Sequence, residues 1–168
     1  KFYLDQLGLL QPSSIELPEV GKPQYPSRWG DISTMTISYG HGISVSPLQL
    51  AGAVGTLVNG GKRLPLSLIK HRSLAPPIGI RVLSEKTSLQ MRELMRLVVT
   101  NGTGKKAAAP GYLVGGKTGT AEKQVNGGYE KQSLMSSFVG AFPIDKPRYV
   151  ILTMLDEPKG TERTANYA

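Results

Sequence analysis

The spacing of apolar positions predicts two amphipathic helices in the middle of the chain. The first begins at Ser46-Pro47, because a serine N-cap, a proline in the first turn and Gln49 three residues on form a capping box. Asn59-Gly60-Gly61 ends it. Its apolar face is formed by Leu50, Val54, Leu57 and Val58. Because small residues occupy much of the remaining surface, we expect close neighbours to bury this helix.

The second helix follows Ser84, which caps it, and ends at Asn101-Gly102. Its apolar positions recur at intervals of three and four residues, as one face of a helix requires. They are Met91, Leu94, Met95 and Val98. This face predicts packing against the core of the molecule.

The segments before and between these helices are irregular in pattern. Residues 2–9 resemble the end of a helix, with Gly8 as its terminator. Residues 11–34 contain four prolines and predict a long surface excursion with Trp29 as its one large anchor. Residues 37–45 are punctuated by glycine and short of regular structure. Residues 62–83 predict extended pieces interrupted by prolines.

The last third of the chain predicts a β-sheet. Residues 136–142 and 149–155 are apolar at alternate and intervening positions, which is typical of strands covered on both faces. Residues 143–147 are short enough to join them as an antiparallel hairpin, and Asn126-Gly127-Gly128 predicts a second turn. Helices on both faces of such an antiparallel sheet give an α/β sandwich.

Composition sets limits on the class of protein. The chain has 168 residues, 39% of them hydrophobic and 19% charged, which fits one globular domain or most of one. It has no cysteine, so disulfides and thiol chemistry are excluded. The net charge is +8, yet the basic residues are not interleaved with aromatics, which argues against a nucleic-acid groove. No apolar stretch approaches the ~20 residues that a transmembrane helix needs, and the start of the chain does not resemble a signal peptide.

The strongest candidate for chemistry is the run Leu-Val-Gly-Gly-Lys-Thr-Gly-Thr-Ala at residues 113–121. On a strand, Lys117 would offer a cation, and Thr118 and Thr120 would offer hydroxyl donors, to an anionic substrate tail. Gly119 would let the substrate lie against the backbone, and the N–H of Thr120 could serve as an oxyanion donor. The same sequence also fits an ordinary exposed edge-strand turn, so the Lys-Thr-Gly triplet alone does not decide between a substrate-binding strand and such a turn.

Four blocks together resemble the C-terminal part of the transpeptidase domain of class B penicillin-binding proteins, most closely the cell-division type. These blocks are Ser27-Arg28-Trp29, the stretch from Ile37 to Leu50, Asn59-Gly60-Gly61, and Gly116-Lys117-Thr118-Gly119-Thr120-Ala121. The resemblance runs over residues 1–168, which would form a portion of one such domain. It implies a fold with a five-stranded antiparallel sheet and helices on both faces.

The resemblance also implies an activity. A serine would attack the D-Ala-D-Ala end of a peptidoglycan stem peptide, and an amine from a neighbouring strand would displace the acyl-enzyme. β-Lactams would acylate the same serine. Lys117 would be catalytic and bind substrate, Thr118, Gly119 and Thr120 would bind the substrate or β-lactam, and the Thr120 N–H would complete the oxyanion hole. The resemblance implies no cofactor and no metal.

The nucleophile that the family requires has no credible place in this sequence. Ser67-Leu68-Ile69-Lys70 fits the Ser-x-x-Lys pattern as letters, but it lies in a strand-like segment rather than at a helix start. Thr164-Ala165-Asn166 echoes Ser-x-Asn in the wrong order. We therefore expect a fragment truncated at both ends, with the serine elsewhere. His41 reads as a turn or packing residue and Glu122 as solvated, not as catalytic groups.

Partners and location follow from the resemblance as expectations. They are peptidoglycan stem peptides, β-lactams, the remainder of the domain, and divisome proteins including a membrane glycosyltransferase, at the periplasmic face of the inner membrane. Nucleic acid is not expected. Two other functions remain open: a serine β-lactamase or carboxypeptidase that shares the motif, and a non-catalytic module that binds or senses cell-wall peptides or β-lactams.

Overall fold

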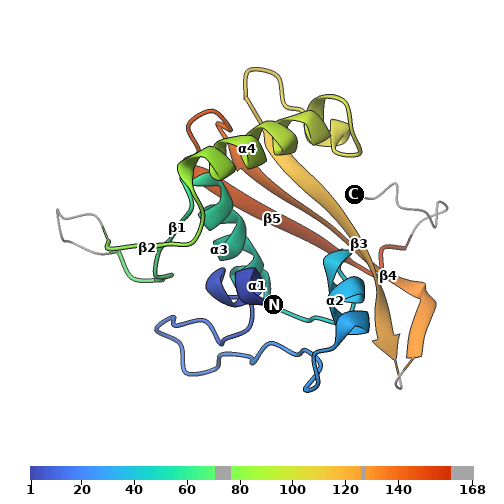
Figure 1. The fold of residues 1–168 in the computed structure, drawn as a ribbon. Helices are drawn as coiled ribbons and strands as arrows, with labels where there is room; N and C mark the ends of the chain where they lie inside the picture. Colours follow the sequence, from blue (N-terminus) through green and yellow to red (C-terminus); the bar gives the residue numbers. More distant parts are fainter. Residues whose placement is uncertain (71–76, 126–127, 160–168) are drawn as a thin grey trace. The chain divides into compact units, whose positions relative to one another are not determined.

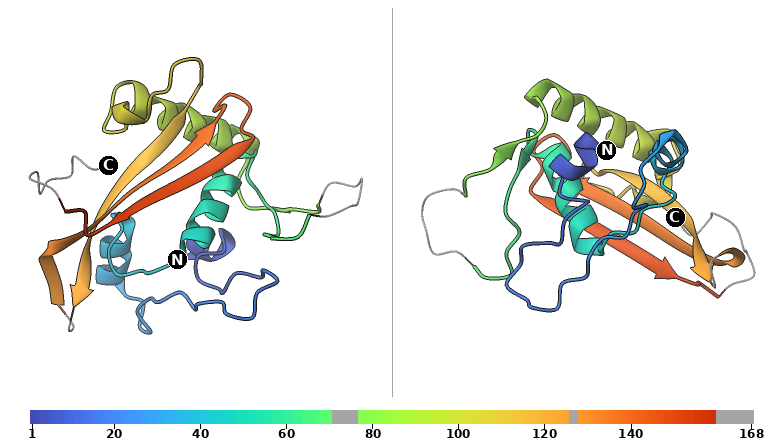
Figure 2. Two further views of the ribbon diagram at one scale, coloured as in Figure 1. Left: turned by 180° about the vertical axis from the view of Figure 1, so that it is seen from behind. Right: turned by 60° about the horizontal axis from the view of Figure 1, so that its bottom comes forward.

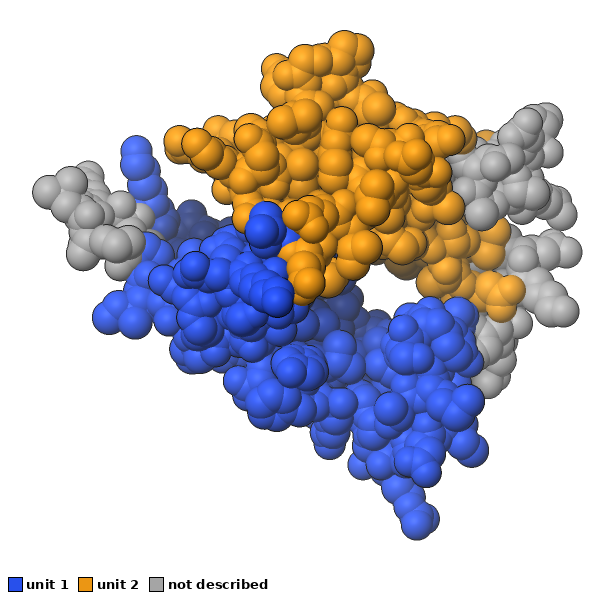
Figure 3. Space-filling model, turned by 45° about the horizontal axis from the view of Figure 1, so that its top comes forward, with its two compact units in different colours: residues 1–89 blue, residues 90–168 orange. Residues whose placement is uncertain are grey.

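The computed structural model describes residues 1–70, 77–125 and 128–159, which form helices and antiparallel strands (Figures 1 and 2). The chain divides into two compact units, Lys1–Leu89 and Gln90–Ala168, coloured separately in Figure 3. Among the described residues, no helix combines the length and the apolar character that a bilayer crossing requires.

Among its described residues, the first unit contains three complete helices and a short strand pair. They are α1 (Phe2–Gln6), α2 (Asp31–Ser38), α3 (Pro47–Val58), β1 (Lys62–Arg63) and β2 (Ile80–Arg81). The predicted helix end near residue 8 is confirmed, because α1 ends at Gln6 and Gly8 has a φ of +82°. The excursion after it is irregular up to residue 30, apart from an isolated bridge between Gln24 and Ser44.

Helix α3 begins as predicted. The backbone N–H of Gln49 donates to Ser46 Oγ at 3.2 Å, and the Ser46 N–H donates to Gln49 Oε1 at 2.9 Å, which completes the capping box. Its buried face differs from the prediction, since Leu50 and Leu57 are only half-buried. The buried residues are Gln49, Ala53, Val54, Thr56 and Val58. The amide of Gln49 is satisfied there by the carbonyls of Gly8 and Gln11.

Helix α2 (Asp31–Ser38) corrects two predictions, since it overlaps the end of the excursion predicted over residues 11–34 and the start of the stretch predicted to lack regular structure over residues 37–45. Its sequence, Asp-Ile-Ser-Thr-Met-Thr-Ile-Ser, is rich in β-branched and hydroxyl residues, which are weak helix formers. Two hydroxyls bond back to carbonyls four residues earlier, Thr34 to Gly30 and Thr36 to Ile32. Of its apolar side chains only Ile37 is buried, so the pattern gave little sign of a helix.

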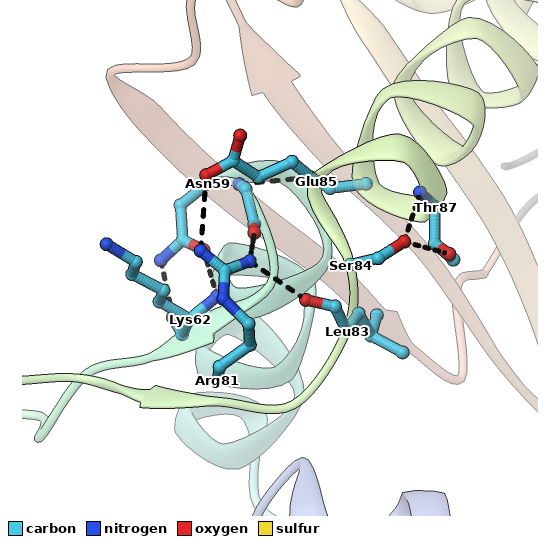
Figure 4. Close-up of polar contacts among 9 residues, drawn as sticks. Asn59, Lys62, Arg81, Leu83, Ser84, Glu85 and Thr87 are labelled. Atoms are coloured by element: carbon cyan, nitrogen blue, oxygen red, sulfur yellow. Dashed lines mark hydrogen bonds and ion pairs between the residues drawn. The ribbon is translucent and has the colours of Figure 1, made fainter.

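The end of α3 and the start of α4 (Glu85–Thr100) are joined by polar contacts. Ser88, fully buried, donates its hydroxyl to the Leu57 carbonyl at 2.6 Å and accepts from the Gly60 N–H at 3.0 Å. Arg81 donates to the carbonyls of Gly60 and Leu83 and forms an ion pair with Glu85 at 3.1 Å (Figure 4). The predicted cap of α4 is confirmed, since the Thr87 N–H donates to Ser84 Oγ at 3.0 Å.

The segment between α3 and α4 is extended and proline-rich, as predicted. Strands β1 and β2 pair antiparallel, with Lys62 opposite Arg81 and Arg63 opposite Ile80. Residues 71–76 of this segment lie outside the described residues.

The second unit holds most of α4, a short 3₁₀ turn (Lys105–Ala107) and a three-stranded antiparallel sheet. Its strands are β3 (Gly115–Val125), β4 (Gly128–Phe142) and β5 (Tyr149–Asp156), in the order β3-β4-β5. The predicted hairpin between β4 and β5 is confirmed. Strands β3 and β4 also pair, and residues 126–127 of the predicted turn between them lie outside the described residues. The described residues thus carry three strands of the sheet type that the resemblance implies.

Two burial predictions in this part of the chain are wrong. On α4 the buried residues are Ser88, Met95 and Val99, whereas Leu94 is 55% exposed, so the buried face is rotated from the one predicted. Strand β5 is not covered on both faces, because Tyr149 and Ile151 alternate as exposed residues with half-buried Val150 and Leu152. An apolar run therefore overstated how much of β5 this chain itself buries.

Candidate active-site strand

Strand β3 carries all four predicted site residues and is an edge strand of the three-stranded sheet that the described residues form. Lys117 and Thr120 are exposed, and Thr118 and Gly119 are half-buried. An edge strand directs alternate backbone N–H and C=O groups away from its neighbour, where an extended ligand can reach them. The run therefore combines reachable backbone groups with a cation and hydroxyls.

The register with β4 assigns the side chains of this run to two faces. Paired residues across an antiparallel sheet share a face, and successive residues alternate. Thr118 lies opposite Phe138 and Thr120 opposite Ser136, so the two hydroxyls share one face. Lys117, opposite Val139, starts from the other face, and its Nζ donates to the Thr118 carbonyl at 2.7 Å. The amine is thus folded back along the strand toward the threonine.

A hydroxyl outside the strand contacts Thr118. Thr103 lies in the segment after α4, and its Oγ1 is 2.8 Å from Thr118 Oγ1, so either oxygen can donate to the other. This contact limits the orientations of the Thr118 hydroxyl. Sequence reasoning missed Thr103, because no motif connects a loop threonine to a strand residue fifteen positions later.

The two glycines before Lys117 are required by packing, because a side chain at either position would clash with its neighbours. A Cβ on Gly116 would lie 2.3 Å from the Phe138 ring and 2.6 Å from the Val139 carbonyl. A Cβ on Gly115 would lie 2.6 Å from Ile144 and 3.2 Å from the Arg96 backbone nitrogen on α4. Gly140, opposite Gly116, would likewise meet the Phe138 ring at 2.7 Å. These glycines let one aromatic ring and one helix seat closely on the sheet next to Lys117.

Gly119 is in close contact with the Ser137 hydroxyl of the neighbouring strand. The Ser137 hydroxyl donates to the Gly119 carbonyl at 3.3 Å, and a Cβ on Gly119 would lie 2.8 Å from that hydroxyl. A glycine here therefore serves the β3–β4 pairing as well as any ligand that approaches the strand. Ser137, like Thr103, is a neighbour of the candidate site that the sequence did not single out.

Comparison with known proteins identifies the family. Residues 1–168 match the penicillin-binding protein transpeptidase domain over the full length of the chain. The chain belongs to this transpeptidase family. It is 42% identical, over 175 aligned positions, to the probable peptidoglycan D,D-transpeptidase FtsI of Caulobacter vibrioides, an alignment that covers 99% of this chain and 30% of that protein.

Solved transpeptidase structures share the fold. The transpeptidase domain of Burkholderia pseudomallei penicillin-binding protein 3, in its apo form, is 39% identical with a TM-score of 0.87 and aligns with 94% of this chain and 48% of its own. Penicillin-binding protein 3 of Mycobacterium tuberculosis, in complex with aztreonam, is 34% identical with a TM-score of 0.85, covering 94% of this chain and 39% of its own. The predicted α/β fold and family are confirmed, and this chain spans less than half of each solved chain.

The candidate nucleophile motif of the transpeptidase family at Ser67 lacks the required context. Ser67 lies in irregular chain just before a bend at residues 68–69, not at a helix N-terminus, and its hydroxyl donates to Glu16 and accepts from the Ile69 N–H. This confirms the prediction that the Ser67-x-x-Lys70 letters do not mark a helix start. Residues 164–166 lie outside the described residues.

The other two residues considered for catalysis lie elsewhere in the fold. His41 follows α2, its N–H donates to the Thr36 carbonyl at 3.0 Å, and its ring lies 5.4 Å from that of Tyr39. Glu122 is half-buried rather than solvated as predicted, at the point where the register of β3 and β4 shifts. His41 thus occupies the turn-and-packing position that its two flanking glycines suggested.

Proposed function

We propose that residues 1–168 are the C-terminal portion of one transpeptidase domain and supply the substrate-binding strand of a peptidoglycan D,D-transpeptidase. The supporting observation is strand β3, which presents Lys117, Thr118 and Thr120 together on an open sheet edge. An extended peptide with an anionic end matches such an edge in both shape and charge. The family and the D,D-transpeptidase names of its relatives support the same activity.

In the proposed reaction, a serine from polypeptide outside this sequence attacks the carbonyl carbon between the two terminal D-alanines. The C–N bond breaks, the last D-alanine leaves with the proton, and an acyl-enzyme forms. An amine of a second stem peptide then displaces the serine oxygen and forms the crosslink. Thr118 and Thr120 hydroxyls hold the substrate carboxylate, Lys117 supplies positive potential, and the Thr120 N–H stabilises the oxyanion.

The proposed setting is the division septum, at the periplasmic face of the inner membrane. The relative named FtsI supports this assignment, as do Trp29 and the stretch Tyr39–Gly42, which carry the resemblance to the division type. We propose that the remainder of the same domain, divisome proteins and a membrane glycosyltransferase are the partners. The aztreonam complex of a similar protein supports binding of β-lactams by this chain's own domain.

Labelling of the full-length protein by a fluorescent penicillin tests the role of β3. Hydrogen bonds to charged groups contribute about 1.5–3 kcal/mol, so Thr120→Val should slow acylation by roughly 10- to 100-fold. Lys117→Ala should slow it at least as much. Lys86→Ala, an exposed lysine on α4, is the matched control and should label at the normal rate. Unchanged acylation in both β3 variants would refute the proposed roles.

The same preparation separates the alternatives. Sustained hydrolysis of nitrocefin beyond one equivalent would indicate a β-lactamase or carboxypeptidase. Penicillin labelling without crosslinking of a stem-peptide donor to an amine acceptor would indicate a sensor. A transpeptidase is expected to show a nitrocefin burst of one equivalent and to form the crosslinked product.

A further inference from the structure

The hydroxyl of Ser137 contacts the candidate active-site strand from the neighbouring strand. Ser137 lies on β4, directly opposite Gly119, and is half-buried. Its hydroxyl donates to the Gly119 carbonyl oxygen at 3.3 Å. A contact of this length is a weak hydrogen bond, so it adds little to the stability of the strand pair. It shows, however, that the Gly119 carbonyl is turned toward β4.

The Gly119 carbonyl shares one peptide unit with the N–H of Thr120. The bond between these two residues is trans, and the C=O and N–H groups of a trans peptide unit point in opposite directions within one plane. Because the Gly119 oxygen points toward β4, the Thr120 N–H points to the other side of β3, where the described residues place no strand. This is the N–H that the proposed reaction uses to stabilise the oxyanion.

The preceding peptide unit of β3 has a different donor at its carbonyl. The Thr118 oxygen accepts from Lys117 Nζ at 2.7 Å, and this amine belongs to an exposed side chain of the same strand. Successive carbonyls of a strand point alternately toward and away from a given neighbour. Ser137 therefore acts on the peptide unit whose N–H faces outward, and not on the unit before it.

Glycine at position 119 allows this contact. The φ of Gly119 is not positive, so the backbone conformation does not by itself require glycine. A Cβ at this position, however, would lie 2.8 Å from Ser137 Oγ and would displace the hydroxyl. Gly119 thus allows a hydroxyl to approach the peptide unit from β4, in addition to allowing a substrate to approach the strand.

A hydrogen bond to a peptide carbonyl affects the N–H of the same unit in two ways. It polarises the amide, which makes the N–H a stronger donor, as happens along any chain of hydrogen bonds. It also restricts rotation of the peptide plane, and an oxyanion donor is effective only within about 2.7–3.1 Å of the position that the oxyanion takes. Both effects increase as negative charge develops on the substrate oxygen, and so they act mainly in the transition state.

We propose that Ser137 is a positioning residue for the oxyanion donor: its hydroxyl orients the Gly119–Thr120 peptide unit and strengthens the Thr120 N–H as a donor to the tetrahedral intermediate. This inference rests on the proposed function, because it requires that the Thr120 N–H serve as the oxyanion donor. Since Ser137 acts through the peptide unit and not on the substrate itself, its loss should lower the rate of acylation and leave the initial binding of a β-lactam unchanged.

The experiment compares Ser137→Thr with Ser137→Val in the full-length protein. The two new side chains have nearly the same shape and differ in the hydroxyl, so any strain from the branched side chain is common to both. The nitrocefin burst, followed by stopped flow over a range of concentrations, gives the dissociation constant of the initial complex and the acylation rate constant separately. Ser137→Val should acylate about 2- to 10-fold more slowly than Ser137→Thr, the range for one neutral hydrogen bond. The dissociation constants should agree within about twofold.

Thr153→Val is the matched control. The Thr153 hydroxyl donates to the Phe138 carbonyl at 3.4 Å, between β4 and β5, which is the same kind of contact on a peptide unit outside the site. This variant should acylate within about twofold of the unaltered protein. Where the branched side chains prevent folding, as thermal melts would show, Ser137→Ala against the unaltered serine provides the same comparison.

A spectroscopic measurement reports on the hydrogen bond itself. Stronger donation to the ester carbonyl of the acyl-enzyme lowers its stretching frequency, which isotope-edited infrared difference spectra of a β-lactam labelled with ¹³C at that carbonyl can measure. Ser137→Val should raise this frequency relative to Ser137→Thr, and Thr153→Val should leave it unchanged. A residue that only supported the strand pair would lower stability without this selective shift.

Several results would overturn the inference. They are equal acylation rate constants in Ser137→Thr and Ser137→Val, equal losses in Ser137→Val and Thr153→Val, an ester frequency that does not move, and a change confined to the dissociation constant. The proposed function fails in a different way, through unchanged acylation in both Lys117→Ala and Thr120→Val. If those two variants are slow and Ser137→Val is not, the inference about Ser137 alone is wrong.

Discussion

The hydroxyls of Thr103 and Thr118 lie 2.8 Å apart, although one belongs to the segment after α4 and the other to strand β3. The pair shares a single hydrogen bond, so each hydroxyl restricts where the other can point. If Thr118 binds a substrate carboxylate, Thr103 is a positioning residue for that contact. This relationship makes Thr103 a target for mutation outside the recognised motif.

Thr103→Val should slow penicillin acylation of the full-length protein by about 2- to 10-fold, the range expected for one neutral hydrogen bond. Thr118→Val should slow it more, and Thr103→Val added to Thr118→Val should have almost no further effect, because the partner hydroxyl is already absent. Thr100→Val is the control, since its exposed hydroxyl donates to carbonyls of its own helix, α4. Equal effects of Thr103→Val with and without Thr118 would show that the two residues act independently.

Gly116→Ala should destabilise the protein by about 1–3 kcal/mol, because the added methyl would overlap the Phe138 ring and the Val139 carbonyl. Phe138→Leu, added to Gly116→Ala, should restore only the part of the lost stability that the overlap with the ring causes. Gly55→Ala is the contrasting change: a Cβ there meets nothing within 4 Å, and alanine is favoured in a helix by about 0.5–1 kcal/mol. Urea unfolding of the three variants checks the order, and a stable Gly116→Ala protein would contradict the packing described.

Ser88→Ala should also destabilise, by about 2 kcal/mol or more, because it leaves the Leu57 carbonyl and the Gly60 N–H without their partner. Ser27→Ala, at an exposed position, should change the free energy of unfolding by less than about 0.5 kcal/mol. Calorimetric melting temperatures provide the comparison. Equal melting temperatures for the two variants would mean that water replaces the serine hydroxyl.

Arg81→Ala should cost more stability than Glu85→Gln. The ion pair is exposed, 46% at Arg81 and 78% at Glu85, and such pairs contribute at most about 0.5 kcal/mol. Arg81 additionally bonds two carbonyls near the end of α3 and the start of α4, so its loss should cost about 1 kcal/mol. Raising the salt concentration should reduce the effect of Glu85→Gln and leave most of the effect of Arg81→Ala.

Local signals explain which elements could be predicted from the sequence. The caps at Ser46 and Ser84 depend on residues three positions away, and the β4–β5 hairpin depends on a short proline-bounded link. Because these residues are close together in the sequence, the sequence alone was enough to predict both caps and the hairpin. Helix α2 could not be predicted in this way, because its residues are weak helix formers and Ile37 is its one buried apolar side chain.

The candidate site shows the same difference between features that local sequence predicts and features that depend on tertiary packing. The Lys117 run was identified from its letters and from the resemblance, and the structure places it on an open edge. Its neighbours Thr103 and Ser137 depend on tertiary packing that no local pattern encodes. Leu94 illustrates the limit for burial: a periodic apolar face does not specify its rotation when polar residues such as Ser88 share the buried side.

The Phe138 ring above Gly116 and Gly140 has a consequence for directed evolution of this strand. If all of β3 were randomised, most variants in the library would carry a side chain at position 116 and could not pair β3 with β4. Survivors should retain glycine at position 116 and diversify at positions 117, 118 and 120. Altered acyl-donor selectivity would therefore be sought at those three codons, with position 103 as the fourth.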